Sequence, residues 1–225
     1  MQPRFVCAQN EPGGGRTYLS AFERDPLTGL ATRQGFNQAA RELIDAYPSE
    51  RFVVLYGDID RFKVFNDRYG TEEGDRLLRS IGSSIRQALP AKSVASHLRG
   101  DHFVCCLPEH AGNPEHVLGM LDSWLSAYPL DFAFFVRIGM YRVDDPSLDV
   151  SLMTDRALLA LRSAKSGSER YAMYDDSLRE SVVQEQELAG QMADALKAGQ
   201  FELYFQPQYQ HGTNRLVGAE VLARW

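Results

Sequence analysis

Cysteine is scarce in this sequence, which limits the chemistry that thiols can supply. The three cysteines among 225 residues, Cys7, Cys105 and Cys106, are too few for a disulfide framework. Cys105 and Cys106 are adjacent in the apolar run HFVCCL, a pattern typical of small core residues and unlike the spaced pairs that bind metals. We therefore expect no metal or redox role for these cysteines.

Long apolar runs and an excess of basic residues are also missing. No stretch approaches the ~18 consecutive apolar residues that a membrane helix needs, and the N-terminal MQPRFVCAQNEPGGG has no apolar signal core. We therefore expect a cytoplasmic protein without a membrane segment. With 24 Lys+Arg against 30 Asp+Glu the formal net charge is −6, which argues against nucleic acid as a partner but allows one anionic nucleotide held by a few cations.

The overall composition is that of a folded globular protein. At 44% hydrophobic, 24% charged and 11% aromatic residues, the chain is unlike disordered, collagen-like or coiled-coil sequences. Its length allows one full domain with a remainder, or two small domains. Residues 1–20 are polar and contain three adjacent glycines, so they predict a flexible lead-in.

Helical and strand-like patterns alternate as far as residue 174. Helical periodicity predicts helices over residues 33–47, 73–89, 115–126 and 152–165. Strand-like runs occupy residues 51–60, a hairpin at 93–107, and residues 132–143 and 171–174. This order predicts an α+β fold with helices packed on an antiparallel-containing sheet. A helix at 178–198 and two further strand-like runs lie outside this predicted sandwich.

Acidic residues gather directly after the first predicted strand, in GDIDRFKVFNDRYGTEEGD. Two carboxylates one residue apart at a strand end, Asp58 and Asp60, can present oxygen ligands to Mg²⁺, which usually bridges to substrate phosphates. Asn66 with Asp75 has the groups to bind the edge of a purine, and Lys63 or Lys165 can meet a phosphate. On spacing alone, a solvated acidic loop is the favoured alternative, because such pairs occur often by chance.

Four segments, in order, resemble a GGDEF domain of the diguanylate cyclase family. They are DPLTGLATRQGF at 25–36, GDIDRFKVFNDRYGTEEGDRLL at 57–78, RGDHF at 99–103 and DRALLALRSAKSGSERYAMY at 155–174. The resemblance implies a palm-like sheet, related to nucleotidyl cyclases and ferredoxin-like folds, over residues 21–176. It also implies a reaction in which two domains face to face, as in a homodimer, join two GTP molecules into cyclic di-GMP with the help of metal ions.

The resemblance assigns roles to individual residues. It implies Mg²⁺ binding by Asp58, the Ile59 carbonyl and Asp101, guanine binding by Asn66 and Asp75, and phosphate contacts by Lys63 and Lys165. The sequence departs from the family at its signature loop, which reads Arg99, Gly100, Asp101, His102 and Phe103. No intact catalytic set is therefore expected.

Each departure has a chemical consequence. Arg99 replaces a glycine that lets the backbone approach phosphates, and His102 replaces a carboxylate that suits Mg²⁺ better than an imidazole does. Thr71 and Ser168 stand where the family usually has His and Arg, and residues 90–93 read PAKS in place of the family's RxxD inhibition motif. We expect a degenerate domain that binds GTP, holds Mg²⁺ weakly, has weak or absent cyclase activity and lacks feedback binding of cyclic di-GMP.

The C-terminal segment has a resemblance of its own. Residues 187–225 look like the opening of an EAL domain, the cyclic di-GMP phosphodiesterase family, with Glu220 as a metal ligand, Gln206 as a substrate contact and Arg224 as a phosphate contact. The family's barrel needs roughly 250 residues, so residues 200–225 would be an incomplete start that follows a connecting helix at 177–199. We expect the strands around Phe205 and Val221 to pair with each other, dock on the first domain or pair with another copy.

Three functions fit these patterns. The favoured one is a regulatory GTP-binding module of a GGDEF–EAL protein, which controls a downstream phosphodiesterase that this chain does not complete. The second is an interaction or dimerisation domain that binds no nucleotide. The third is a weakly active diguanylate cyclase with a variant loop.

Overall fold

The computed structural model describes residues 23–225, which divide into two compact units. The first unit ends at Leu178 and the second runs from Arg179 to Trp225. The predicted lead-in at 1–20 and Cys7 lie outside the described residues. Within the described part of the chain, every helix is too short or too polar to cross a membrane.

A five-stranded sheet forms the centre of the first unit, with the strand order β2-β3-β1-β4-β5. Its strands are β1 (Phe52–Asp60), β2 (Val94–Arg99), β3 (His102–Pro108), β4 (Phe135–Arg142) and β5 (Tyr171–Met173). Neighbouring strands are antiparallel except β4 and β5, which run parallel. The predicted α+β fold with an antiparallel-containing sheet is therefore confirmed, although β4 begins three residues later than the apolar run suggested.

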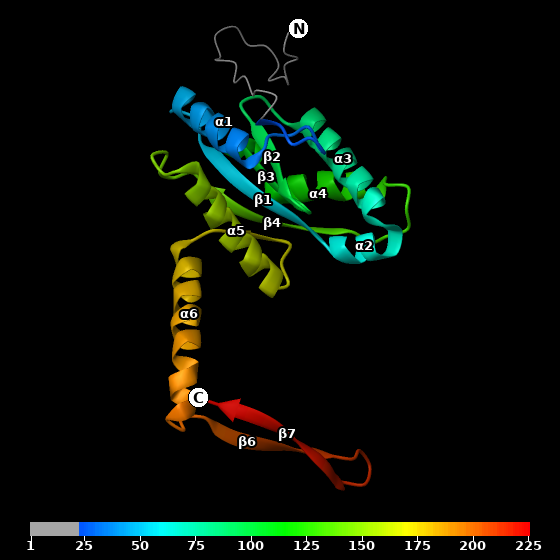
Figure 1. Ribbon diagram of the computed structural model, residues 1–225, viewed down its shortest axis with the longest axis vertical. Coiled ribbons are helices and arrows are strands. Elements are labelled where there is room, and N and C mark those ends of the chain that lie inside the picture. The colour runs from blue at the N-terminus through cyan, green and yellow to red at the C-terminus, as the bar shows by residue number, and fades with distance from the viewer. Residues whose placement is uncertain (1–22) are drawn as a thin grey trace. The chain divides into compact units, whose positions relative to one another are not determined.

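Helices cover both faces of this sheet (Figure 1). They are α1 (Arg33–Ala46), α2 (Phe62–Tyr69), α3 (Thr71–Ala88), α4 (Pro114–Ser126) and α5 (Val150–Ser166), with a short 3₁₀ helix η2 at Glu109–Ala111. Residues of α1 and α5 form one hydrophobic cluster with the sheet, and residues of α2, α3 and α4 form the other. The sequence patterns did not predict α2, which follows β1 almost directly.

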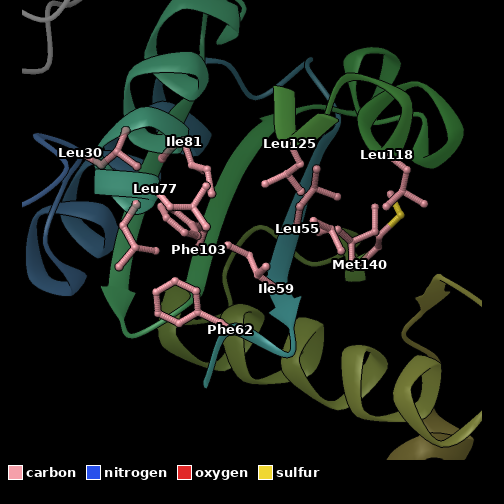
Figure 2. Packing of buried hydrophobic residues seen from close by; sticks show 14 of the residues in the cluster. Leu30, Leu55, Ile59, Phe62, Leu77, Ile81, Phe103, Leu118, Leu125 and Met140 are labelled. Atoms are coloured by element: carbon pink, nitrogen blue, oxygen red, sulfur yellow. The ribbon is translucent and has the colours of Figure 1, made fainter. Parts of the chain in front are cut away.

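Strand β1 separates these two clusters by simple alternation. Leu55 and Ile59 contribute to the cluster under α3 and α4, where Figure 2 shows them beside Leu125 and Phe103. Val54 and Tyr56 point to the other face and join the cluster under α1 and α5. Because side chains of a strand alternate between faces, Asp58 shares the α1/α5 face with Val54 and Tyr56.

Helix α5 lies unusually close to the sheet at one glycine of β4. A Cβ atom at Gly139 would overlap the carbonyl oxygen of Ala157 and the backbone nitrogen of Leu161. Any side chain at this position would therefore push the helix away from the strand. This close contact helps to fix the position of α5, whose last turn carries Lys165.

The second unit consists of most of α6 (Asp176–Lys197) and a hairpin of β6 (Glu202–Tyr209) and β7 (Leu216–Arg224). The two strands are antiparallel, with Phe205 opposite Val221. The first of the three predicted pairings, in which these strands pair with each other, is therefore confirmed. Most hairpin residues are exposed, including large apolar ones such as Phe205 and Val217.

Candidate functional site

A buried carboxylate at the end of β1 forms the centre of the candidate site. Asp58 is 4% exposed and lies directly opposite His102 of β3 in the antiparallel register. His102 Nδ1 is 3.2 Å from Asp58 Oδ1, and the ammonium group of Lys165 contacts Asp58 Oδ2. Opposite residues of an antiparallel pair present their side chains on the same face, so the register of two strands brings Asp58 and His102 together.

Asp101, in the turn between β2 and β3, completes this cluster. One ligand atom from each of Asp58, Asp101 and His102 lies within 4.8 Å of the others. Burial raises the pKa of Asp101, and the neighbouring Asp58 carboxylate raises it further. Two carboxylates and an imidazole nitrogen that converge in this way can hold a divalent cation.

A histidine of β2, His97, contacts the backbone of the turn that precedes Asp101. His97 Nε2 is 2.8 Å from the carbonyl oxygen of Gly100, and His97 Nδ1 is 3.0 Å from Asp25 Oδ2. Burial raises the pKa of Asp25, but hydrogen bonds from the side chain and backbone of Thr28 and the contact with His97 outweigh it, so the pKa is lowered. Sequence reasoning did not single out Asp25 or His97, although Asp25 begins the first segment of the resemblance.

The corner between α2 and α3 brings the predicted base-binding residues to one place. The side-chain oxygen Asn66 Oδ1 is buried and has no hydrogen-bond partner in the described part of the chain. It lies against Gly74, where a Cβ atom would overlap it. Asp75 follows Gly74 and is half-exposed, with only a 3.9 Å contact to Arg79. The corner thus holds a buried acceptor oxygen next to a half-exposed carboxylate.

The two predicted phosphate lysines have different surroundings. Lys63 is exposed in the first turn of α2, which begins after Arg61 in a left-handed conformation with φ 64°. Backbone N–H groups at a helix start have no partner within the helix and favour anions. Lys165 instead contacts Asp58. Of these two lysines, Lys165 would have to give up its contact with Asp58 to bind a phosphate, whereas Lys63 is exposed at the start of α2.

The residues that depart from the family pattern mostly lie at the surface. Arg99 is exposed next to Gly100 at the hairpin tip, and Thr71 and Ser168 are exposed as well. Phe103 is buried, and its ring centroid is 4.9 Å from that of His97. The imidazole of His102 is the departure that points into the cluster around Asp58.

The hairpin of the second unit gathers the residues assigned to the EAL resemblance on one face. Gln206 is directly opposite Glu220, and Arg224 lies four residues after Glu220 on the same strand, opposite Glu202. Because strand side chains repeat every two residues, the side chains of Gln206, Glu220 and Arg224 share one face. All three are exposed.

An apolar cavity of about 500 Å³ lies in the first unit between α3, α4 and the sheet, and Asp58 is among the residues that line it. Its walls include Ile81 and Ile85 of α3, Leu121 and Trp124 of α4, and Cys105 of β3. The described residues that line it include no lysine or arginine. A triphosphate therefore has no cationic partner there, and the polar cluster at Asp58 remains the candidate for a nucleotide's phosphates.

The two cysteines of β3 belong to the hydrophobic clusters on opposite faces of the sheet, where Cys106 is buried and Cys105 is partly buried. Cys105 and Cys106 are both free, and burial raises the pKa of each to about 12. A thiol with such a pKa is protonated at neutral pH and is a poor nucleophile and metal ligand.

Comparisons with known proteins identify the family. The chain is 31% identical over 211 residues to the uncharacterized protein y4lL of Sinorhizobium fredii, covering 89% of this chain and 25% of that protein. It is 25% identical to the bifunctional diguanylate cyclase/cyclic di-GMP phosphodiesterase MucR of Pseudomonas aeruginosa, covering 98% of this chain and 33% of MucR. The chain thus spans a quarter to a third of these relatives.

Solved structures and a family model indicate the same family. A sensory box/GGDEF family protein from Caulobacter crescentus is 30% identical, with a TM-score of 0.57, and the match covers 64% of this chain and 99% of that one. The model of the family described as diguanylate cyclase, GGDEF domain, matches residues 22–170. These residues contain the sheet, its helices and the cluster at Asp58, and the chain belongs to the GGDEF family.

Proposed function

We propose that this chain carries a regulatory GTP-binding GGDEF domain of a cyclic di-GMP signalling protein, with little or no cyclase activity of its own. GTP would bind with its base at the α2–α3 corner and its phosphates near Lys63 and the Asp58 cluster. The bound nucleotide would then act on a downstream phosphodiesterase domain of the parent protein.

The buried oxygen of Asn66 is the observation that carries this proposal. A buried carbonyl without a hydrogen bond costs about 1–3 kcal/mol, and Asn66 Oδ1 has no partner among the described residues. Guanine has an amino group and a ring N–H along one edge, and these can donate to Asn66 and to the neighbouring Asp75. Gly74 supports the assignment because its missing side chain leaves the space that Asn66 occupies.

The surroundings of Asp58 support a loss of catalysis. One of its oxygens is in contact with Lys165 and the other faces His102. Asp58, Asp101 and His102 would hold a divalent cation, which when bound would neutralise charge on the phosphates. The imidazole of His102 replaces a second carboxylate of the loop, so it offers one neutral nitrogen ligand where a carboxylate offers charged oxygens.

The second unit supports a link to a phosphodiesterase. MucR, which is matched along 98% of this chain, is named as bifunctional, and the hairpin places Gln206, Glu220 and Arg224 on one face. We propose residues 21–176 as the GGDEF domain, 177–199 as a connecting helix and 200–225 as the start of an EAL domain. A barrel of roughly 250 residues needs more chain than this, so the phosphodiesterase would belong to the parent protein.

Calorimetric titration with GTP, with and without Mg²⁺, tests the nucleotide site. We expect binding in the micromolar to millimolar range, and a loss of about tenfold in Asn66→Ala, because one hydrogen bond contributes about 1–1.5 kcal/mol. Gln87→Ala, an exposed amide on α3, is the matched control and should bind like the wild type. Absence of heat at millimolar GTP would overturn the proposal in favour of an interaction domain without nucleotide.

Incubation with GTP and either Mg²⁺ or Mn²⁺, followed by chromatography, tests the catalytic half. We expect little or no cyclic di-GMP from the wild-type chain and more from His102→Glu, which restores a carboxylate to the loop. Efficient product formation by the wild type would replace the regulatory role with that of a diguanylate cyclase.

A further inference from the structure

One imidazole nitrogen of His102 faces the carboxylate of Asp58. Nδ1 of His102 is buried and has no hydrogen-bond partner among the described residues, and it lies 3.2 Å from Asp58 Oδ1. We propose that Asp58, Asp101 and His102 form a mixed carboxylate–imidazole centre that binds a first-row transition ion, such as Mn²⁺ or Zn²⁺, in preference to Mg²⁺. The ion would bind the chain before any nucleotide arrives.

The distance between the two facing atoms suits a shared ion. Metal–nitrogen and metal–oxygen bonds of about 2.1 Å, set at angles between an octahedral and a tetrahedral arrangement, place neighbouring ligand atoms roughly 3.0–3.4 Å apart. The 3.2 Å between His102 Nδ1 and Asp58 Oδ1 falls in this interval. One ligand atom from each of Asp58, Asp101 and His102 lies within 4.8 Å of the others, so Asp101 can supply the third ligand of the set.

The neighbouring lysine leaves the relevant oxygen available. Lys165 contacts Oδ2 of Asp58, whereas His102 faces Oδ1. Two carboxylates and one ammonium group leave this cluster with one net negative charge when His102 is neutral. A divalent ion between Oδ1, Asp101 and His102 would therefore meet an anionic site whose nitrogen ligand is already in position.

The donor set decides which ion is preferred. Mg²⁺ favours an octahedral shell of oxygen atoms and binds protein nitrogen poorly. Imidazole suits Zn²⁺, Fe²⁺, Co²⁺ and Ni²⁺, and carboxylates also suit Mn²⁺. Replacing one carboxylate of the loop by His102 thus weakens the site for Mg²⁺ and strengthens it for these ions. Three protein ligands still leave coordination positions for water or a phosphate oxygen.

This inference refines the metal side of the proposed nucleotide site and rests on that proposal, but its test uses the metal alone. Mn²⁺ is added to the full chain without nucleotide, and the loss of the free-ion signal is followed by electron paramagnetic resonance. We expect one ion per chain, displaced by Zn²⁺ at comparable concentrations and by Mg²⁺ only at concentrations about 10- to 100-fold higher.

Variants identify the nitrogen ligand. His102→Ala should lower the Mn²⁺ affinity about 10- to 100-fold, and His102→Glu should narrow the difference between Mn²⁺ and Mg²⁺. His116→Ala removes an exposed histidine of α4 and should leave binding unchanged. In the wild-type chain, pulsed electron paramagnetic resonance of bound Mn²⁺ should detect ¹⁴N modulation from a coordinated imidazole. This measurement does not depend on whether a variant folds.

Two results would overturn the inference. One is the absence of Mn²⁺ and Zn²⁺ binding at millimolar concentrations. The other is binding that His102→Ala leaves unchanged and that lacks ¹⁴N modulation, which would make His102 an ion-pair partner of Asp58 only. Either result can occur while GTP still binds through Asn66, so failure of this inference is distinguishable from failure of the proposed function.

Discussion

The imidazole of His97 lies 3.0 Å from the carboxylate of Asp25, although the two residues are 72 positions apart in the chain. The other ring nitrogen of His97 faces the carbonyl oxygen of Gly100 at 2.8 Å. Through these two contacts the ring connects the segment before α1 to the turn that carries Asp101. Asp25 is thus a positioning residue for the signature loop, and it acts through His97.

Asp25→Asn should destabilise the first unit in a pH-dependent way. Because the folded-state pKa of Asp25 is lowered, its ionised form contributes stability above the unfolded carboxyl pKa of about 3.9. That contribution is lost as the pH falls through the lowered pKa. Urea unfolding should therefore show a loss of about 1–3 kcal/mol near pH 7 that shrinks below about pH 4.

Asp131→Asn is the control for this experiment, because Asp131 is exposed and only its backbone carbonyl accepts a hydrogen bond, from Tyr69. It should change stability little at either pH. A difference between Asp25→Asn and the wild type that is as large well below pH 4 as it is at pH 7 would contradict the assigned role of the Asp25 charge.

Gly74→Ala should weaken GTP binding about tenfold, as Asn66→Ala does, while the domain remains folded. The new methyl group would overlap Asn66 Oδ1 and displace that side chain from the α2–α3 corner. Gly119→Ala on α4 is the control, because a Cβ there meets nothing within 4 Å. It should leave GTP binding intact and stabilise its helix by up to about 1 kcal/mol. Wild-type affinity in Gly74→Ala would exclude Asn66 from the base site.

Gly139→Ala should destabilise the first unit by at least about 2 kcal/mol, because the methyl group would enter the backbone of α5 and backbone cannot yield as a side chain can. Thermal unfolding is the measurement, and a lowering of Tm by several degrees is expected. Gly119→Ala again serves as the control. An unchanged Tm would show that α5 tolerates a wider separation from β4 than its packing indicates.

A double-mutant cycle on Asp58 and Lys165 should reveal strong coupling. Lys165→Met leaves the buried Asp58 charge without its ammonium partner and should lower the free energy of unfolding by about 1–2 kcal/mol. This is less than for a fully buried ion pair, because the Lys165 side chain is 37% exposed and solvent screens its charge. The same substitution should cost much less in an Asp58→Asn background, which also removes repulsion with Asp101. Chemical denaturation of the four proteins gives the coupling energy. Additive effects would contradict the ion pair.

Much of the fold follows from local patterns in the sequence. The strand at 51–60 and the helix at 73–89 were predicted because apolar runs and periodicity are local signals, and β1 and α3 confirm them within two residues. Helix α2 was not predicted, because its eight residues include three charged ones and Asn66, and it begins after a left-handed Arg61. Tertiary contacts of Phe62 and Phe65 stabilise this short helix.

The candidate site was predictable in its members but not in its contacts. Motif positions identified Asp58, Asp101 and Lys165, whereas the contact between Asp58 and Lys165 depends on how α5 packs on the sheet. Neither Asp25 nor His97 has a local pattern that indicates a partner so far away in the chain. The roles of the site residues and the EAL origin of the hairpin stay predictions.

The alternation of side chains along strand β1 limits which changes of sequence length the strand can tolerate. The alternation that sends Val54 and Tyr56 under α1 and α5 also turns Asp58 toward Lys165 and His102. Insertion or deletion of one residue before Asp58 would invert every later side chain of the strand. The carboxylate would then face the apolar cluster under α3 and α4. We therefore expect length changes to be tolerated in the loops on either side of β1 and not within the strand.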